Sequence, residues 1–199
     1  MRVIKFALTM VFAVAGLVFF APQRAAAKSS SFTNTFSGTG VTVPLDLDGS
    51  DPAALSAYNS GGGKETGGFF QGSFTYQGVA ESVPDTKGSP SGCVFGYTEC
   101  PINGVTGCLF DVVAGSSVIR DAKTGDLLTS KVTSGSVCFD VSTISYVYSE
   151  DGTITGGTGA AAGVTGPYHE TGSGQFLNAD AVGRNFGWNQ GTRTGTMTK

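Results

Sequence analysis

A glycine-rich segment at residues 154–166 constrains the fold of this chain more than any other feature. It reads Ile-Thr-Gly-Gly-Thr-Gly-Ala-Ala-Ala-Gly-Val-Thr-Gly and lies between two runs of strand-forming residues. Glycine permits positive φ and lets another backbone segment approach closely. The sequence therefore predicts a crowded corner between two strands, of the kind that lets a sheet curl shut. The corner glycines are Gly156, Gly157, Gly159, Gly163 and Gly166.

Short runs of β-branched and aromatic residues recur along the rest of the chain, separated by Gly, Asp, Asn and Ser. This pattern is typical of an all-β sandwich or barrel. Strands are predicted at 32–43, 67–78, 108–119, 127–139, 144–148, 153–155, 164–177 and 186–198. Loops are predicted at 44–66, with a helical turn possible at 52–58, and at 79–107. Asp151-Gly152 fits either a hairpin turn or a bulge within one longer strand.

These strands predict a single all-β domain, an antiparallel up-and-down β-barrel of about eight strands. Closing the sheet removes exposed strand edges, and the 30 glycines after residue 27 suit tight corners and a narrow lumen. The connection from Asp121 to Asp126 suits a type I turn closed by Gly125 in the left-handed conformation. A lipocalin-like barrel or a β-sandwich is the alternative architecture.

The first 27 residues have the pattern of a secretory signal peptide. Arg2 and Lys5 precede an apolar run of 16 residues at 6–21, and Ala25 to Ala27 form a small-residue cleavage site. A spanning helix would need about 20 apolar residues. We therefore expect a secreted or periplasmic protein, with one barrel domain at 28–199.

The charge of the expected mature chain limits its partners. Of the 12 basic residues, Arg2, Lys5 and Arg24 are lost with the leader, while all 15 acidic residues remain, which gives a net charge of −6. Nucleic acid and anionic membranes both require a basic surface. We expect neither as a partner, and the sequence predicts no cofactor.

Four cysteines lie in the expected mature chain: Cys93, Cys100, Cys108 and Cys138. An even number in an exported chain indicates two disulfides, for which three pairings are possible. The favoured pairing is Cys93–Cys100 with Cys108–Cys138. No C-x-x-C pair is present, so a thiolate metal site is not expected.

The glycine corner, the Thr124-Gly125-Asp126 hairpin and Cys138 together resemble small secreted proteins of the allene oxide cyclase/dirigent type. The similarity covers roughly residues 115–199. It implies an antiparallel β-barrel. The family includes cyclases of apolar precursors and proteins that orient a radical coupling without doing chemistry themselves. Because the motif is structural, the resemblance implies the fold and not the reaction.

Aromatic residues supply the candidate site. Alternation places Tyr146 and Tyr148 on one face with Ile144. If this face lines the lumen, the barrel could hold a small apolar molecule, with phenol groups to orient it. Alternatively, the rings simply fill the core, as in most small barrels. Tyr146, Tyr148 and Glu170 are the candidate catalytic residues should the protein be an enzyme.

Three other motifs favour structural interpretations. His169, the only histidine, is expected at the surface, because strand alternation turns it away from Glu170. The spacing at 157–163 matches a loose dinucleotide fingerprint but is followed by Pro167 rather than a helix. An acidic loop could bind calcium, but its spacing departs from the EF-hand and favours a solvated loop of Asx turns. The loop residues are Asp46, Asp48, Ser50 and Asp51.

Three functions remain open on this evidence. The first is a non-catalytic barrel that binds a small apolar molecule or another extracellular component. The second is a cofactor-free cyclase or isomerase of the allene oxide cyclase type. The third is a purely structural surface or matrix protein. The sequence does not determine the oligomeric state.

The leader pattern generates the first prediction. The secreted protein should begin at or near Lys28, because the small-residue site at 25–27 precedes it. N-terminal sequencing and intact-mass measurement of secreted protein check this. Recovery of the full-length chain in a membrane fraction would contradict it.

Overall fold

A computed structural model describes residues 27–47, 49, 51, 53–85, 99–102, 105–178 and 184–199. Residues 1–26 of the predicted signal peptide and Cys93 lie outside this range. The elements are β1 (Ser29–Val43), β2 (Leu55–Gly67), β3 (Ser73–Pro84), β4 (Glu99–Ile102), β5 (Val105–Asp121), β6 (Leu127–Asp140), β7 (Ser145–Gly157), the 3-10 turn η1 (Gly159–Ala161), β8 (Gly166–Phe176) and β9 (Asn185–Thr198).

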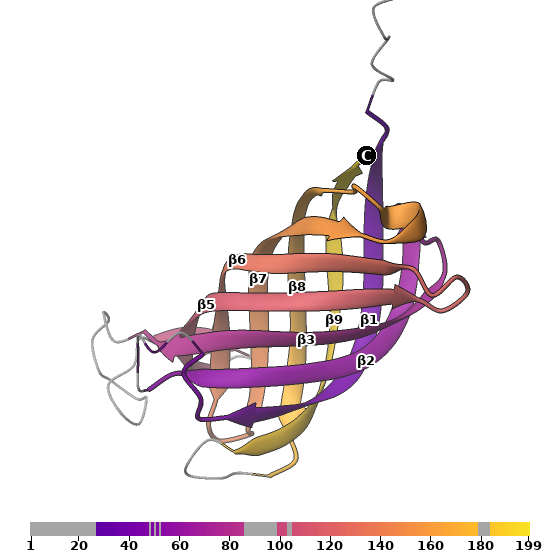
Figure 1. Ribbon diagram of the computed structural model, residues 1–199. Helices are drawn as coiled ribbons and strands as arrows, with labels where there is room; N and C mark the ends of the chain where they lie inside the picture. The colour runs from indigo at the N-terminus through magenta and orange to yellow at the C-terminus, as the bar shows by residue number, and fades with distance from the viewer. Residues whose placement is uncertain are drawn as a thin grey trace, which may run out of the picture.

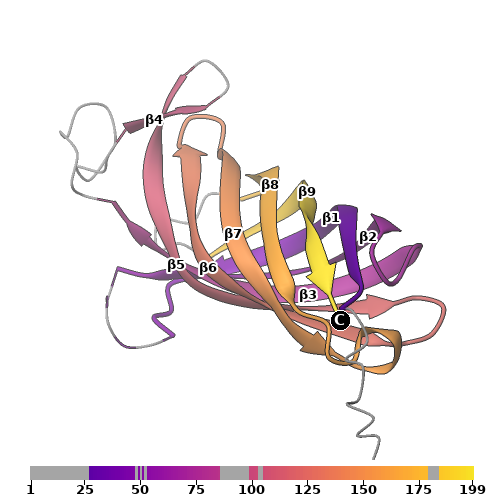
Figure 2. The ribbon, with the colours of Figure 1, turned by 90° about the horizontal axis from the view of Figure 1, so that it is seen from above.

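The described strands form a closed antiparallel barrel in which each wall strand pairs with its neighbour in sequence. Eight strands, all but β4, make the wall: β3 pairs with β5, and β1 pairs with β9 to close the circle. Strand β4 pairs with β5 beyond the wall. Figure 1 shows β2, β3, β5 and β6 crossing in front of the other four strands, and Figure 2 gives the view from above. The predicted up-and-down barrel is confirmed, and the sandwich alternative is wrong.

Two predicted loops are wrong in part. Residues 55–66 belong to β2, and the helical turn considered at 52–58 is strand from Leu55 onward. The glycines at 61–63 resemble a loop in sequence, but Gly61 and Gly63 face inward where the rings of Tyr76 and Phe74 need space. Within 79–107, β3 continues to Pro84, and β4 and the start of β5 follow.

The structure decides the two predictions made for turns, at residues 121–126 and 151–152. The β5–β6 hairpin has Gly125 at φ 79°, and the backbone N–H of Gly125 donates to the Asp121 carbonyl, as predicted. Asp151 and Gly152 lie within the single strand β7, so the longer-strand alternative holds. The register shift lies opposite them, in β6 between Val132 and Ser134.

Aromatic rings alternate with glycines across the inner face of the barrel. The row at Tyr148 continues strand by strand as Gly172, Gly191, Phe36, Gly63 and Phe74. A β-carbon added at Gly172 would lie 2.5 Å from the Tyr148 ring, and one at Gly191 would lie 2.6 Å from the Phe36 ring. Each ring therefore occupies the space that a side chain on the next strand would need.

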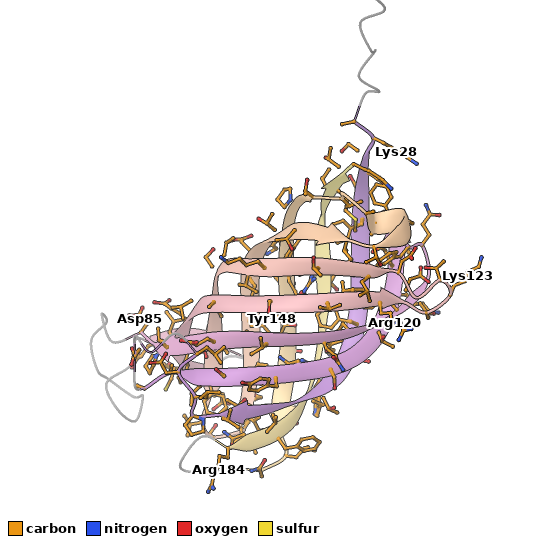
Figure 3. The ribbon with its side chains drawn as sticks, in the orientation of Figure 1. Lys28, Asp85, Arg120, Lys123, Tyr148 and Arg184 are labelled. Carbon is orange, nitrogen blue, oxygen red and sulfur yellow. A yellow bond between two sulfur atoms is a disulfide. The ribbon has the colours of Figure 1, made fainter. Side chains whose placement is uncertain are left out.

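The glycine corner closes one end of the barrel. Gly159 and Gly163 adopt φ values of 52° and 76°, as the sequence predicts. Ala161 and Val164 are fully buried there and join an apolar core. The core residues are Phe32, Phe70, Phe74, Ile119, Leu128, Ile154, Ala161, Val164, Tyr168 and Met197. Lys123 of the β5–β6 hairpin and Asp85 after β3 mark opposite ends of the molecule in Figure 3.

The favoured disulfide pairing is wrong. Cys100 on β4 bonds to Cys138 on β6, with a Cα–Cα distance of 5.9 Å. Cys108 lies opposite Phe139 in register, so its side chain projects from the other face of the sheet than that of Cys138. Cys108 is also disulfide-bonded.

Substitution of the corner glycines tests this packing. Gly159→Ala should destabilise the protein by about 2–3 kcal/mol, because in addition to the strain of positive φ its β-carbon would displace the Asp126 carboxylate, which accepts from the Ala160 N–H at 2.9 Å. Gly163→Ala meets open space and should cost only the strain of positive φ, about 1–2 kcal/mol. Urea denaturation of both variants measures the difference. Equal losses would show that the collision does not matter.

Candidate functional site

One inward row of the barrel is polar instead of aromatic. Five residues lie directly opposite one another in register on five successive strands. They are Glu150 on β7, Glu170 on β8, Arg193 on β9, Asn34 on β1 and Glu65 on β2. Three carboxyl groups and one guanidinium thus follow the same register line inside the barrel, and we call these residues the polar row.

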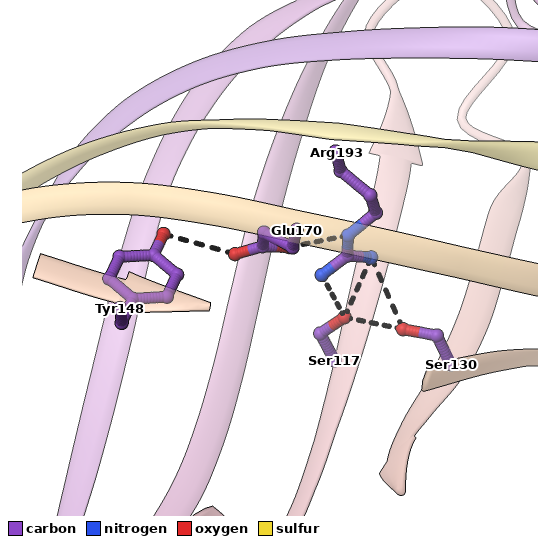
Figure 4. Close-up of polar contacts among 5 residues, drawn as sticks. All are labelled: Ser117, Ser130, Tyr148, Glu170 and Arg193. Atoms are coloured by element: carbon purple, nitrogen blue, oxygen red, sulfur yellow. Dashed lines mark hydrogen bonds and ion pairs between the residues drawn. The ribbon is translucent and has the colours of Figure 1, made fainter. Parts of the chain in front are cut away.

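The centre of the polar row is an ion pair between Arg193 and Glu170. The Arg193 Nε donates to Glu170 Oε2 at 2.6 Å, and both side chains are about nine-tenths buried. The other guanidinium nitrogens donate to the hydroxyls of Ser117 and Ser130 at 3.2–3.3 Å (Figure 4). The Arg193 guanidinium also lies over the Tyr168 ring, 4.3 Å from its centre. Arginine is thus held on several sides, as a buried charge requires.

Tyr148 completes this network from β7. Its hydroxyl donates to Glu170 Oε1 at 3.1 Å, so both oxygens of Glu170 are engaged (Figure 4). Burial raises the pKa of Tyr148, and the neighbouring carboxylates of Glu170 and Glu150 raise it further. Tyr148 therefore stays a neutral donor to Glu170.

Glu150 is the carboxyl group of the row that can exchange a proton near neutral pH. Burial raises its pKa to about 7, the Glu170 charge raises it as well, and Arg193 opposes both effects. Its direct register partner is Glu170, and like charges in this position disfavour ionisation. Glu150 is only partly buried, so solvent can reach it.

The cavity beside the polar row is small. Its volume is about 20 Å³, and its walls include Asn34, Tyr76, Glu170 and Arg193. A single water needs roughly 10–15 Å³ of space for its centre to move in. The cavity therefore suits one water and no larger molecule. The Oδ1 of Asn34 is buried there with no donor among the described residues.

Above the polar row, at the end opposite the glycine corner, three rings line the lumen. The centre of the Tyr146 ring is 5.2 Å from that of Phe176, which is 5.7 Å from that of Phe139. All three side chains are partly exposed. We call Phe139, Tyr146 and Phe176 the aromatic mouth. Burial raises the pKa of Tyr146 to about 12.

The structure brings together some of the predicted residues and separates others. Tyr146, Tyr148 and Glu170 all face the lumen. Ile144 precedes β7 with φ 52°, so the alternation that placed it beside the tyrosines does not reach it. His169 lies on the outer surface and points away from Glu170, as predicted. Its Nδ1 is 2.9 Å from Asp151 Oδ1.

Carboxylates of the acidic loop accept from its own backbone in the described part, with an Asx turn in which Asp51 Oδ1 accepts from the Ala53 N–H at 2.8 Å. The two carboxylate oxygens of Asp46 accept from the N–H groups of Gly49 and Asp51 at 2.6 and 2.9 Å. Asp48 and Ser50 lie outside the described residues. Within the described residues, no group of three or more His, Cys, Asp or Glu side chains could hold a metal ion.

Sequence reasoning missed Arg193 and Glu150, the two residues that give the polar row its charge balance. Both lie at inward positions of their strands. Arg193 is on the same face of β9 as Asn189 and Met197, and Glu150 is on the same face of β7 as Tyr148. A charged residue at an inward position of a strand is a signal that the sequence does contain.

Searches of protein-family models, curated proteins and solved structures return no match to this chain. In the part of the chain that the structure describes, no helix is long and apolar enough to cross a membrane.

The raised pKa of Glu150 generates a pH prediction. A carboxyl whose folded pKa lies above its ordinary value of 4.5 stabilises the protein at low pH, and this contribution is lost as the pH rises towards 7. Glu150→Gln should therefore be more stable than the wild type at pH 8, by about 1–3 kcal/mol, and the gap should close by pH 4.5. Urea denaturation across this range measures it, with exposed Glu99→Gln as control. A gap that does not change with pH would contradict the assignment.

Proposed function

We propose that this protein is an exported, non-catalytic β-barrel that binds a small, mainly apolar molecule at the aromatic mouth. The observation that carries the proposal is the cluster of Phe139, Tyr146 and Phe176, whose rings are partly exposed at the end of the barrel opposite the glycine corner. Partly exposed aromatic rings with a nearby phenol provide apolar contact and one orienting hydrogen bond.

The position of the ligand follows from the space available. The cavity beside the polar row holds only about 20 Å³, and the apolar core fills the end at the glycine corner. A ligand would therefore rest on the mouth rings or displace them, and would not enter the polar row.

The engagement of Glu170 favours binding over catalysis. A general base needs a lone pair that the substrate can reach, and the Glu170 side chain is about nine-tenths buried. Both oxygens of Glu170 already accept, one from Tyr148 and one from Arg193. The Tyr148 hydroxyl is committed in the same bond, so these two candidate catalytic residues act as a structural anchor.

Export is supported by the leader pattern and by the disulfide between Cys100 and Cys138, since disulfides persist in oxidising compartments. The relationship to the allene oxide cyclase/dirigent type belongs to the same proposal. It rests on the glycine corner and is compatible with the barrel.

A cofactor-free cyclase or isomerase is the second candidate, because of Glu150. A partly exposed carboxyl with a pKa near 7, next to a fixed ion pair, is suited to general acid–base catalysis. In that case Glu150, rather than the predicted Glu170, would move the proton, with Tyr146 oriented towards the substrate.

Two experiments test the binding proposal. Organic extracts of the protein purified from its secretion medium are analysed by mass spectrometry for apolar compounds, and the fluorescent probe 1-anilinonaphthalene-8-sulfonate is titrated into the purified protein. Tyr146→Ala and Phe176→Ala should each weaken probe binding about tenfold or more, because each removes a ring of the mouth. Val113→Ala, at an exposed position on β5, is the matched control and should bind as the wild type does.

Unchanged probe binding in both mouth variants, with no compound in the extract, would overturn the proposal in favour of a structural protein. If a recovered compound is converted by the wild type and not by Glu150→Gln, the second candidate replaces the first. Retained binding without conversion supports the non-catalytic barrel.

A further inference from the structure

A second aromatic surface lies on the outside of the barrel, at the same end as the mouth but on the opposite face of the sheet. Its side chains are among the most exposed large apolar groups of the described residues. They are Tyr58 at 38% exposure, Val41 at 41%, Phe186 at 48%, Trp188 at 37% and Leu177 at 64%. We call these five residues the outer aromatic patch.

The patch is continuous across three neighbouring strands. Val41 on β1 lies directly opposite Tyr58 on β2 and directly opposite Phe186 on β9. Figure 2 shows β9, β1 and β2 following one another round the wall. Trp188 is two residues from Phe186 and projects from the same face. The Leu177 N–H donates to the Phe186 carbonyl at 2.7 Å, which extends the patch beyond β8.

Strand geometry fixes the spacing of the rings. Tyr58 and Phe186 are two strand spacings apart, or about 10 Å, and Phe186 and Trp188 are about 7 Å apart along β9. The backbone positions of the three rings thus lie side by side on one wall, and we call these three residues the platform. Arg184, which precedes Phe186, marks this end of the barrel in Figure 3.

The wall around the platform is polar but carries almost no charge. The outward positions of β1 and β9 beside it are Ser37, Thr39, Gln190 and Thr192, and those of β8 are Thr171, Ser173 and Gln175. Along β1, β8 and β9, outward positions include no Asp, Glu, Lys or Arg, and His169 is the one titratable group there, whereas β2, which carries Tyr58, has the exposed Lys64 at an outward position six residues further along. Hydroxyl and amide groups therefore surround the rings.

We propose that the outer aromatic patch binds a neutral polysaccharide. The flat apolar face of a sugar ring packs on an aromatic ring, and its hydroxyls pair with amide and hydroxyl side chains at the edge. A neutral polysaccharide carries no charged groups, so none would be left unpaired against the uncharged outward positions of β1, β8 and β9.

The same composition argues against other occupants. Nucleic acid and anionic membranes need a cluster of Lys or Arg, whereas the outward positions of β1, β8 and β9 carry none, and Lys64 on β2 and Arg184 before β9 lie on opposite sides of the rings in sequence. A second copy of the chain would use the same rings, but interfaces between proteins are depleted in serine at their centres, whereas serine and threonine dominate this wall.

Trp188 is the only tryptophan in the chain, so its fluorescence reports directly on the patch. The protein is incubated with insoluble cellulose, chitin and β-1,3-glucan, and soluble oligosaccharides of each are titrated while emission is recorded. At least one of the three polysaccharides should retain the protein, and its oligosaccharide should shift the Trp188 emission to shorter wavelength. Phe186→Ala should reduce retention at least tenfold.

Val118→Ala, at an exposed position on β5, is the matched control and should be retained like the wild type. Circular dichroism melting verifies that each variant is folded. Tyr146→Ala should also be retained, which separates this proposal from binding at the mouth. Failure of all three polysaccharides to retain the protein or shift the emission overturns the proposal. A shift that depends only on protein concentration overturns it in favour of self-association.

Discussion

Contact between an aromatic ring and a glycine on the next strand sets the bore of this barrel. Eight strands leave room for about one layer of side chains inside, and a ring on every inward position would not fit. Tyr148 lies against Gly172, Phe36 against Gly191 and Phe74 against Gly63. Glycine costs conformational entropy on folding, and here that cost is offset by buried ring surface. The glycine content of the chain is therefore a consequence of its narrow lumen.

The polar row interrupts this arrangement and depends on it. Arg193 and Glu170 are buried among rings, where an unpaired charge would be strongly destabilising. The ring of Tyr168 covers the guanidinium, and the hydroxyl of Tyr148 occupies the second oxygen of Glu170. The aromatic residues thus supply both the walls and part of the hydrogen bonding of the charged centre. What remains for a ligand is the partly exposed set of rings above it.

The sequence predicts the barrel because alternation and turn residues are local signals. Gly159 and Gly163, which a glycine-rich corner predicts to be at positive φ or under close backbone contact, do adopt positive φ. The strand at Leu55–Gly67 could not be predicted from local sequence, because its glycines make room for the rings of Phe74 and Tyr76, which lie on another strand. The pairing of Cys100 with Cys138 likewise depends on β4 joining the edge of β5. Tyr148 and Glu170 were identifiable one at a time, but their link to Arg193 requires the register of three strands.

The pairing of the first strand with the last has a consequence for how the molecule forms. Lys28 and Lys199 exchange backbone hydrogen bonds at 3.0 and 3.1 Å, so the two chain ends of the barrel lie side by side. Arg193, the counter-charge of Glu170, is on the last strand. A chain synthesised from its N-terminus therefore carries Glu65, Glu150 and Glu170 before Arg193 exists, and the barrel cannot close until β9 has been made. The same adjacency makes the barrel suited to circular permutation, with the new ends cut in an outer loop.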